Sequence, residues 1–246
     1  MTSLVYTIIY LFKPIYWFVY MRIHFCTFGS KGWERSMARI KQEAIESGYF
    51  TDIHTYDETN LPGLEDHDEF IATNKRGYGY WIWKPLVILD VMRKSTEGDI
   101  IVYADTGSTI SVQKEKFQQL IQDVVTHPTH RVAYVSEYCE GLWTKRDVFD
   151  FFGSTDFTQR QLGGSPQFLM NTPENEYVMQ DWLRVMCIDS YHLVDDSVSI
   201  GKNYEPFGEH RHDQSILSFI YRKYDFCATY YDMDRDPILP SRIKDC

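Results

Sequence analysis

The sequence predicts an α/β protein, a three-layer α/β/α sandwich with helices on both faces of a mostly parallel sheet. Short apolar runs suited to buried strands alternate with segments of helical periodicity, which is the pattern of parallel strands joined by helices. The 246 residues are 43% hydrophobic and 16% aromatic, so the chain can bury a substantial core. No linker, internal repeat or low-complexity segment divides it. We therefore expect residues 21–246 to form a single domain.

Each expected element has a local signal. Residues 33–47 and 114–126 carry apolar side chains at helical spacing, and Pro85 suits the first turn of a helix, where no N–H is needed. Strands are expected at 21–28, 49–56, 99–104, 132–135 and 167–170. Helices are expected at 33–47, 85–94, 114–126, 147–152, 175–187 and 213–222.

Charge and cysteine content argue against several classes of protein. Lys and Arg number 25 against 35 Asp and Glu, a formal net charge of −10, whereas proteins that bind nucleic acid favour a basic surface. We therefore expect no nucleic-acid partner. The five cysteines are scattered and include no C-x-x-C pair, which argues against a disulfide framework and a structural zinc site. Reduced thiols favour a cytoplasmic location.

Residues 1–20 form a separate apolar segment. Its core, residues 4–20, is interrupted by Lys13 and Pro14 and is shorter than the roughly 20 apolar residues that a spanning helix needs. The chain starts with MTS, which lacks the basic residues that open a cleavable signal. We expect a membrane-associating anchor; an apolar extension packed on the domain and a true span are the alternatives. The protein would then be cytoplasmic and membrane-associated, or else membrane-anchored in the secretory pathway.

Asp105 and Gly107 end the strand expected at 99–104, in the stretch GDIIVYADTGSTI. In open α/β sheets, ligands bind where buried strands end. A carboxylate there can hold a divalent metal or a ribose hydroxyl, and a glycine lets a ligand approach the backbone. An Asp-Gly turn without a ligand is an equally good interpretation of this stretch alone.

Residues 76–85, RGYGYWIWKP, combine two glycines, four aromatic rings and two cations. The rings offer flat faces to a nucleobase or a sugar, and Arg76 and Lys84 can neutralise a diphosphate. The alternative is a glycine-kinked loop whose rings are buried in the core. The crowding of these residue types favours a ligand-binding segment.

Residues 208–217, GEHRHDQSIL, precede and begin an expected helix. A structural role as N-cap or first-turn acid explains Asp213 but not the two histidines before it. His210 or His212 can supply an imidazole ligand to a metal held by Asp105, or a general base. We therefore expect at least one of these residues to be functional.

Two further segments are candidates for binding an acceptor. Gly163 and Gly164 precede the strand expected at 167–170 and would leave room beside the sheet, although they also fit a simple turn. Trp143 is expected on a loop, where it can stack on a sugar face or serve as a hydrophobic plug.

Taken in order, these segments resemble the GT-A glycosyltransferases, and in particular small bacterial and viral sugar transferases. The ordered set is MRIHFCTFGS, GYGYW-W-KP with KPLVILDVM, GDIIVYAD, the Gly-Gly strand and HRHDQSIL, over about residues 21–225. In that family a D-x-D motif binds a divalent metal, usually Mn²⁺, that bridges the donor's diphosphate. Asp105 matches the first acid, but Gly107 stands at the second. The pair Asp213-Gln214 is similar to an Asp-Gln segment that approaches the donor sugar in related families.

The resemblance implies transfer of a hexose from a nucleotide-diphosphate sugar to a hydroxyl of a glycan or related acceptor. Arg76, Lys84, Asp105, Gly107 and Gln214 would bind the donor, and Trp143, Gly163 and Gly164 the acceptor. Asp105 and His210 would hold the metal, and Asp213 and His212 would be catalytic. A non-catalytic sugar- or nucleotide-binding module and a nucleotidyltransferase remain alternatives.

Overall fold

The computed structural model describes residues 21–245. The predicted apolar segment at 1–20, and with it the expected membrane anchor, lies outside the described residues. None of the helices within residues 21–245 combines the length and apolarity that crossing a membrane requires.

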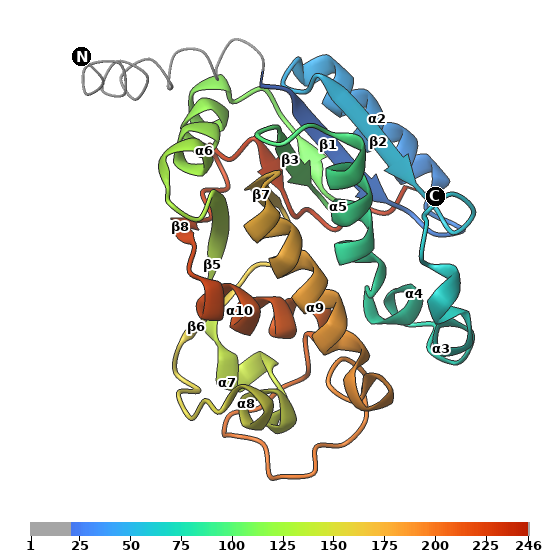
Figure 1. The fold of residues 1–246 in the computed structure, drawn as a ribbon, viewed down its shortest axis with the longest axis vertical. Helices are drawn as coiled ribbons and strands as arrows, with labels where there is room; N and C mark the ends of the chain where they lie inside the picture. Colours follow the sequence, from blue (N-terminus) through green and yellow to red (C-terminus); the bar gives the residue numbers. More distant parts are fainter. Residues whose placement is uncertain (1–20, 246) are drawn as a thin grey trace, which may run out of the picture.

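Helices and strands alternate along most of the described chain (Figure 1). The strands are β1 (Ile23–Phe28), β2 (Asp52–Tyr56), β3 (Ile100–Tyr103), β4 (Thr109–Ile110), β5 (Arg131–Cys139), β6 (Arg160–Leu162), β7 (Gln167–Met170), β8 (Cys227–Tyr230) and β9 (Ile238–Leu239). The helices are α2 (Glu34–Ser47), the 3₁₀ turn η1 (Glu65–His67), α3 (Asp68–Thr73), α4 (Gly77–Tyr80), α5 (Trp83–Lys94), α6 (Lys114–Thr126), α7 (Glu140–Trp143), α8 (Arg146–Phe152), α9 (Pro173–Tyr191) and α10 (His212–Tyr224).

The main sheet has seven strands in the order β2-β1-β3-β7-β5-β6, with β8 beside β5. β1 is parallel to β2 and β3, and β5 is parallel to β8. β7 is antiparallel to both β3 and β5, and β6 is antiparallel to β5. Only β6 and β7 therefore run against the other strands of this sheet, and the predicted α/β fold with a mostly parallel sheet is confirmed.

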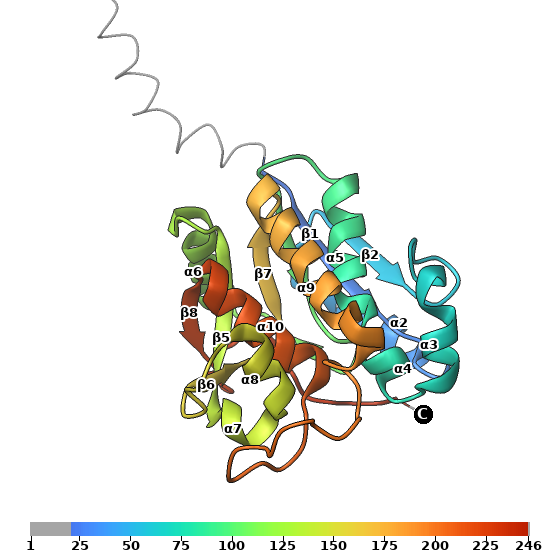
Figure 2. The same cartoon turned by 60° about the horizontal axis from the view of Figure 1, so that its bottom comes forward.

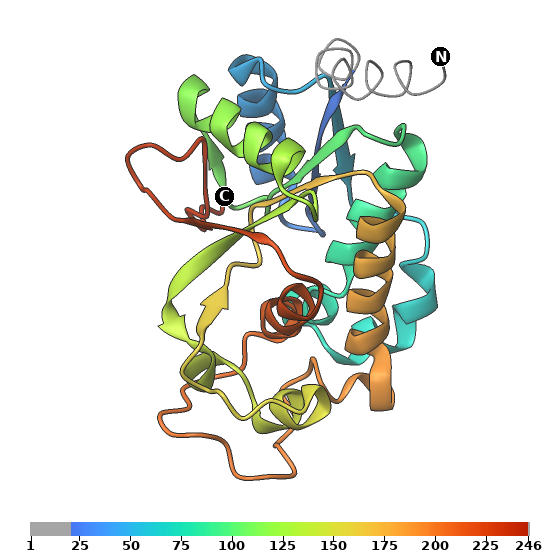
Figure 3. The same ribbon diagram turned by 60° about the vertical axis from the view of Figure 1, so that its left-hand side comes forward.

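Successive side chains of the strands enter two cores, one on each face of the sheet. In β3, Ile101 and Tyr103 share a core with α5, α9 and α10, whereas Ile100 and Val102 share one with α2 and α6. Figure 3 shows this layering, with orange α9 and green-to-teal α5 on one side and light green α6 and blue α2 on the other. The three predicted layers are therefore present.

Most predicted element boundaries are close to the observed ones, and the largest differences are at the C-terminal ends of β5 and α9. The strand expected at 132–135 extends over Arg131–Cys139, and the helix expected at 175–187 over Pro173–Tyr191. β4, β6, β8 and β9 were not predicted, because segments of two to four residues carry little periodicity.

The chain returns to the end of β3 through residues 238–245, here called the C-terminal strap. β9 pairs with β4, and the backbone N–H of Ile243 donates to the carbonyl oxygen of Gly107 at 2.9 Å. Nε of Arg39, on α2, donates to Oδ2 of Asp245 at 2.7 Å. Figure 2 shows the red strap ending beside α2. The strap therefore covers the loop that carries Asp105.

Candidate active site

Asp105 lies at the edge of the sheet where the parallel strands β1 and β3 end. Its backbone N–H donates to Oγ of Ser165 at 2.9 Å, and its Oδ1 accepts a hydrogen bond from the hydroxyl of Tyr103 at 2.5 Å. The Asp105 side chain is 37% exposed. The carboxylate is thus held in place while part of it remains accessible to a ligand.

Lys84, in the first turn of α5, joins Asp105 to Asp213, in the first turn of α10. Its Nζ lies 3.1 Å from Oδ1 of Asp105 and 2.8 Å from Oδ2 of Asp213. Lys84 and Asp213 are each 4% exposed. An unpaired charge is costly to bury, so the three groups depend on one another.

Burial and the neighbouring charges set the protonation states of these groups. Burial acts to lower the pKa of Lys84, but Asp105 and Asp213 outweigh it and raise that pKa above its usual value. Burial raises the pKa of Asp213 to about 6, although Lys84 acts to lower it. At neutral pH the charged ammonium of Lys84 therefore lies beside the carboxylate of Asp213, which gains a proton in mild acid.

Gly163 and Gly164 bring the chain between β6 and β7 close to α10 and to residues after β8. A Cβ at Gly164 would lie 3.2 Å from Cβ of Gln214 and 3.5 Å from Oδ2 of Asp213. A Cβ at Gly163 would lie 2.2 Å from the hydroxyl oxygen of Tyr231. The space predicted for an acceptor beside the two glycines is thus occupied by side chains of the protein itself.

Gln214 is held by a buried polar network that the sequence analysis missed. Its Nε2 donates to Oε1 of Gln161 at 2.9 Å, and Nε2 of Gln161 donates to Oε2 of Glu140 at 3.2 Å. Glu140 is completely buried and also accepts hydrogen bonds from the hydroxyls of Thr144 and Ser218. Burial raises the pKa of Glu140, against the effect of these donors. No local signal marks the burial of Glu140, because Gln161 and Ser218 lie far from it in the sequence.

The two histidines occupy different surroundings. Nε2 of His210 lies 2.9 Å from the carbonyl oxygen of Leu193, and its Nδ1 accepts from the backbone N–H of Lys145. Both ring nitrogens are thus engaged with backbone, and the structure does not bring His210 to Asp105 as expected for a shared metal.

His212 is packed beside the aromatic segment. Its ring stacks on Tyr80 with centroids 4.6 Å apart, and its Nδ1 lies 2.7 Å from the carbonyl oxygen of Val194. Its Nε2 has no hydrogen-bond partner within residues 21–245. Burial lowers the pKa of His212 to about 4, so the ring is neutral at pH 7.

The aromatic segment at 76–85 has some side chains in the hydrophobic core and others at the surface around the site. Tyr80 and Trp83 are buried, and Trp83 stacks on Phe28 with centroids 4.3 Å apart. Arg76 is exposed and pairs with Asp196 at 3.1 Å and with Glu209 at 3.4 Å. The core interpretation therefore holds for Tyr80 and Trp83, whereas Arg76 lies at the surface.

Trp143, expected on a loop, is instead the last residue of the short helix α7, beside Arg211. The guanidinium carbon of Arg211 lies 4.0 Å from the centroid of the indole ring, a cation–π contact that covers one face of the Trp143 ring. Arg211 also pairs with Glu209, its Nη2 lying 3.0 Å from Oε1 of that carboxylate.

The residues of the site do not fit a bound divalent metal. Nζ of Lys84 stands between the two acids nearest the strand end, and His210 is engaged elsewhere. A Cβ on Gly107 would lie 3.3 Å from Cα of Arg242 in the strap, so a side chain at the position of the second acid would crowd the backbone of the strap. Nowhere in residues 21–245 do three or more His, Cys, Asp or Glu side chains group as metal ligands would.

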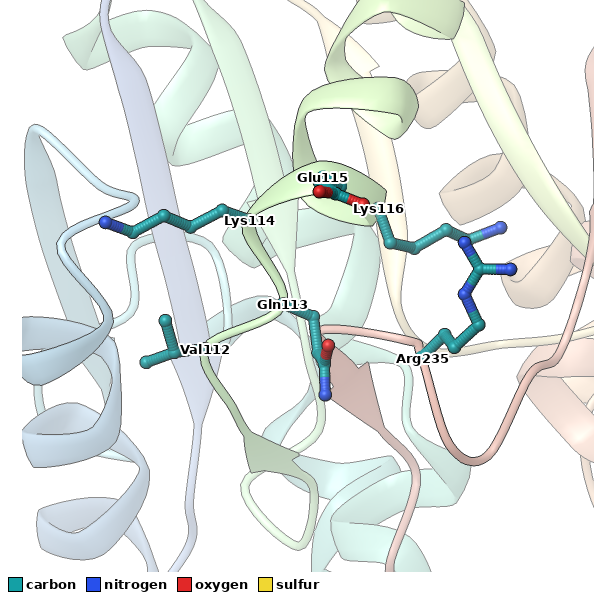
Figure 4. A pocket seen from close by; sticks show the side chains of 6 residues that line it. All are labelled: Val112, Gln113, Lys114, Glu115, Lys116 and Arg235. Carbon is teal, nitrogen blue, oxygen red and sulfur yellow. The ribbon is translucent and has the colours of Figure 1, made fainter.

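Two cavities lie outside this cluster of charged groups. The larger, of about 440 Å³, is at the start of α6 and is lined by Val112, Gln113, Lys114, Glu115, Lys116 and Arg235 (Figure 4). The smaller, of about 260 Å³, is lined partly by Asp196 and Glu209, the two partners of Arg76. Only the smaller cavity shares residues with the rim of the site.

No protein-family model matches the sequence, and no curated protein matches it.

The structure is similar to solved glycosyltransferases, the class that the sequence resembles. One, involved in the glycosylation of the major capsid of PBCV-1, is 10% identical with a TM-score of 0.45, over 86% of this chain and 81% of that chain. Mouse xyloside xylosyltransferase 1 is 12% identical with a TM-score of 0.45, over 85% of each chain. The galactosyltransferase LgtC, solved with donor and acceptor sugar analogues, is 11% identical with a TM-score of 0.47, over 85% of this chain and 73% of that chain. At these values the similarity is distant, and the function proposed below is inferred from the residues of the site.

Proposed function

We propose that the protein is a glycosyltransferase that moves a hexose from a nucleotide-diphosphate sugar to a hydroxyl of a glycan or related acceptor. The observation that carries the proposal is the convergence of Lys84, Asp105 and Asp213 at the edge where β1 and β3 end. Ligands of open α/β proteins bind at this edge. Two acids and a cation there supply acceptors for donor hydroxyls and positive charge for a leaving diphosphate.

The donor would be bound by two side chains that are accessible to solvent, Arg76 and Asp105, and by one that is buried, Lys84. The accessible part of the Asp105 carboxylate would accept hydrogen bonds from the donor's hydroxyl groups, while Arg76, at the rim, would pair with its phosphates. Gly107, expected to bind the donor, is buried against the C-terminal strap, so its backbone is not open to a ligand. The buried ammonium of Lys84 would stabilise the negative charge that develops when the bond from sugar to diphosphate breaks.

Asp213 and Gln214 would orient the sugar at the start of α10. Lys84 fixes the position of Asp213, and Gln161 fixes that of Gln214. Side chains that are already in position lower the entropic cost of reaching the transition state. Asp213 is the stronger candidate for accepting the acceptor's proton, because its pKa is about 6 and that of His212 is about 4.

The acceptor would bind on the side of Trp143 and the smaller cavity. Trp143 offers a ring that can stack on a sugar, and the cavity contributes the polar side chains of Ser197 and Asn203. Gly163 and Gly164 would act by letting the chain approach Gln214 closely. The association of residues 4–20 with a membrane remains a prediction from the sequence.

The proposal is tested by thermal denaturation with UDP-, GDP- and dTDP-sugars, with a CMP-sugar, which has one phosphate, as the control. A ligand of the native state raises the melting temperature. We expect one nucleotide diphosphate sugar to raise it and to be hydrolysed or transferred. Asp105→Asn and Asp213→Asn should each lose turnover, whereas Lys202→Gln, at a residue whose side chain is 85% exposed, should not. Binding without turnover would instead indicate a non-catalytic binding module.

A further inference from the structure

The ammonium of Lys84 occupies the position between Asp105 and Asp213 that a bridging divalent cation would need. Its Nζ is within 3.1 Å of a carboxylate oxygen of each acid, and the Lys84 side chain is only 5% exposed. Within residues 21–245 the Lys84 ammonium, 2.8 Å away, is the only group that neutralises Oδ2 of Asp213. A metal ion at this position would have to displace a buried cation from both of its partners.

The C-terminal strap closes the other possible ligand position. Gly107 stands two residues after Asp105, and an added Cβ would meet Cα of Arg242 at 3.3 Å and the carbonyl oxygen of Ile243 at 3.4 Å. The N–H of Ile243 already donates to the carbonyl of Gly107 at 2.9 Å. A Cβ at position 107, where the second acid would stand, would therefore press against the backbone of the strap.

The strap places Arg242 beside Gly107, two residues after Asp105, while two further arginines share one carboxylate at the rim of the site. Arg76 and Arg211 share the carboxylate of Glu209, at 3.4 Å and 3.0 Å. Arg242 is exposed and makes no ion pair within residues 21–245. Burial lowers the pKa of Arg211; the charge of Glu209 acts to raise that pKa, and the charges of Arg242 and Arg76 act to lower it. A guanidinium without a carboxylate partner among the described residues, as at Arg242, is suited to pair with a diphosphate.

We infer that the donor site operates without a divalent metal, with Lys84 in the metal's place and with Arg242 of the strap pairing with the donor's diphosphate. This inference rests on the proposed function. It assigns a binding role to the C-terminal strap, and it gives a physical reason for glycine at position 107.

The test is isothermal titration of the full chain with UDP, GDP and dTDP, first in EDTA and then in MnCl₂. The variants are Arg242→Gln and, as a matched control, Lys244→Gln. Both remove one positive charge from the strap, but Nζ of Lys244 lies over the Trp33 ring, 5.0 Å from its centroid. Melting temperatures of both variants establish that they are folded.

We expect one diphosphate to bind in EDTA with a Kd that MnCl₂ changes less than about twofold. Arg242→Gln should weaken this binding about tenfold, the loss of one charge-assisted contact, and Lys244→Gln by less than about twofold. Binding that requires Mn²⁺ would overturn the inference and leave the proposed function standing. Equal effects of the two variants would overturn the role of Arg242. Binding of no diphosphate under either condition would overturn the proposed function, and this inference with it.

Discussion

Oδ2 of Asp213 lies 2.8 Å from Nζ of Lys84, and this buried contact joins the first turns of α5 and α10. The N-termini of these two helices therefore meet at the candidate site. Because the N-terminus of a helix carries partial positive charge, both helices add to the attraction of an anionic ligand at this edge. The contact thus combines a structural role, the placement of two helices, with the electrostatics of the site.

Lys84→Met should destabilise the protein by about 3 kcal/mol, because it leaves two carboxylates near one another without their ammonium partner. Adding Asp213→Asn should recover part of this loss, since it removes the more buried of the two charges. Urea unfolding of the single and double variants measures both effects. Lys202→Met, at an exposed residue, should change the free energy of unfolding by less than about 0.5 kcal/mol. Additive effects in the double variant would contradict the proposed coupling.

Asp213 should make the stability of the protein depend on pH between about 4 and 6. Its pKa is 3.8 when unperturbed and about 6 in the fold, so the native state binds the proton more tightly and loses stability as the pH rises through this window. The shift corresponds to about 3 kcal/mol. Asp213→Asn, which mimics the protonated acid, should therefore be more stable than the wild type at pH 7 and inactive.

Unfolding curves of the wild type and Asp213→Asn, measured from pH 4 to pH 8, test this expectation. The difference between their free energies of unfolding should grow with pH and level off above about 7. A constant difference across this range would show that Asp213 does not titrate there.

Gly107→Asp should not create a metal site, although it restores a D-x-D sequence. Its Cβ would lie 3.3 Å from Cα of Arg242, so the strap must move, at a cost of about 1–3 kcal/mol. Hydrogen exchange should become faster at Ile243, whose N–H bonds to Gly107. Stoichiometric Mn²⁺ binding by this variant, observed by electron paramagnetic resonance, would contradict the expectation.

Glu140→Gln should lower kcat about tenfold with little change in KM for the donor. The NH₂ group of the new amide would face hydroxyl and amide groups that now donate hydrogen bonds to the Glu140 carboxylate. Gln161 would lose its hydrogen bond to residue 140 and would no longer fix the position of Gln214. Steady-state kinetics on the donor found in the binding screen measures the effect. Gln180→Glu, at an exposed residue, is the control for a change between the same two residue types. A change in KM alone would indicate that Glu140 does not act through the position of Gln214.

The sequence predicts the parts of this fold that carry a local pattern. Alternating apolar runs and helical periodicity led to the layered α/β architecture, and the rule that ligands bind at strand ends led to Asp105. The convergence of Lys84 and Asp213 on Asp105 depends on how α5 and α10 pack, which periodicity does not specify. The burial of Glu140 and the closeness of the strap to Gly107 could not be predicted either, because each contact joins residues far apart in the chain.

The strap also determines when the candidate site can form during synthesis. A chain leaves the ribosome from its N-terminus, so β1, β3 and Asp105 emerge long before residues 238–245. Until those residues appear, Arg39 and Gly107 lack the hydrogen-bond partners that Asp245 and Ile243 provide. In a nascent chain this end of β3 is therefore uncovered, and premature termination shortly before residue 238 would remove both the strap and Ile238, a buried residue of the core beside α2 and α6.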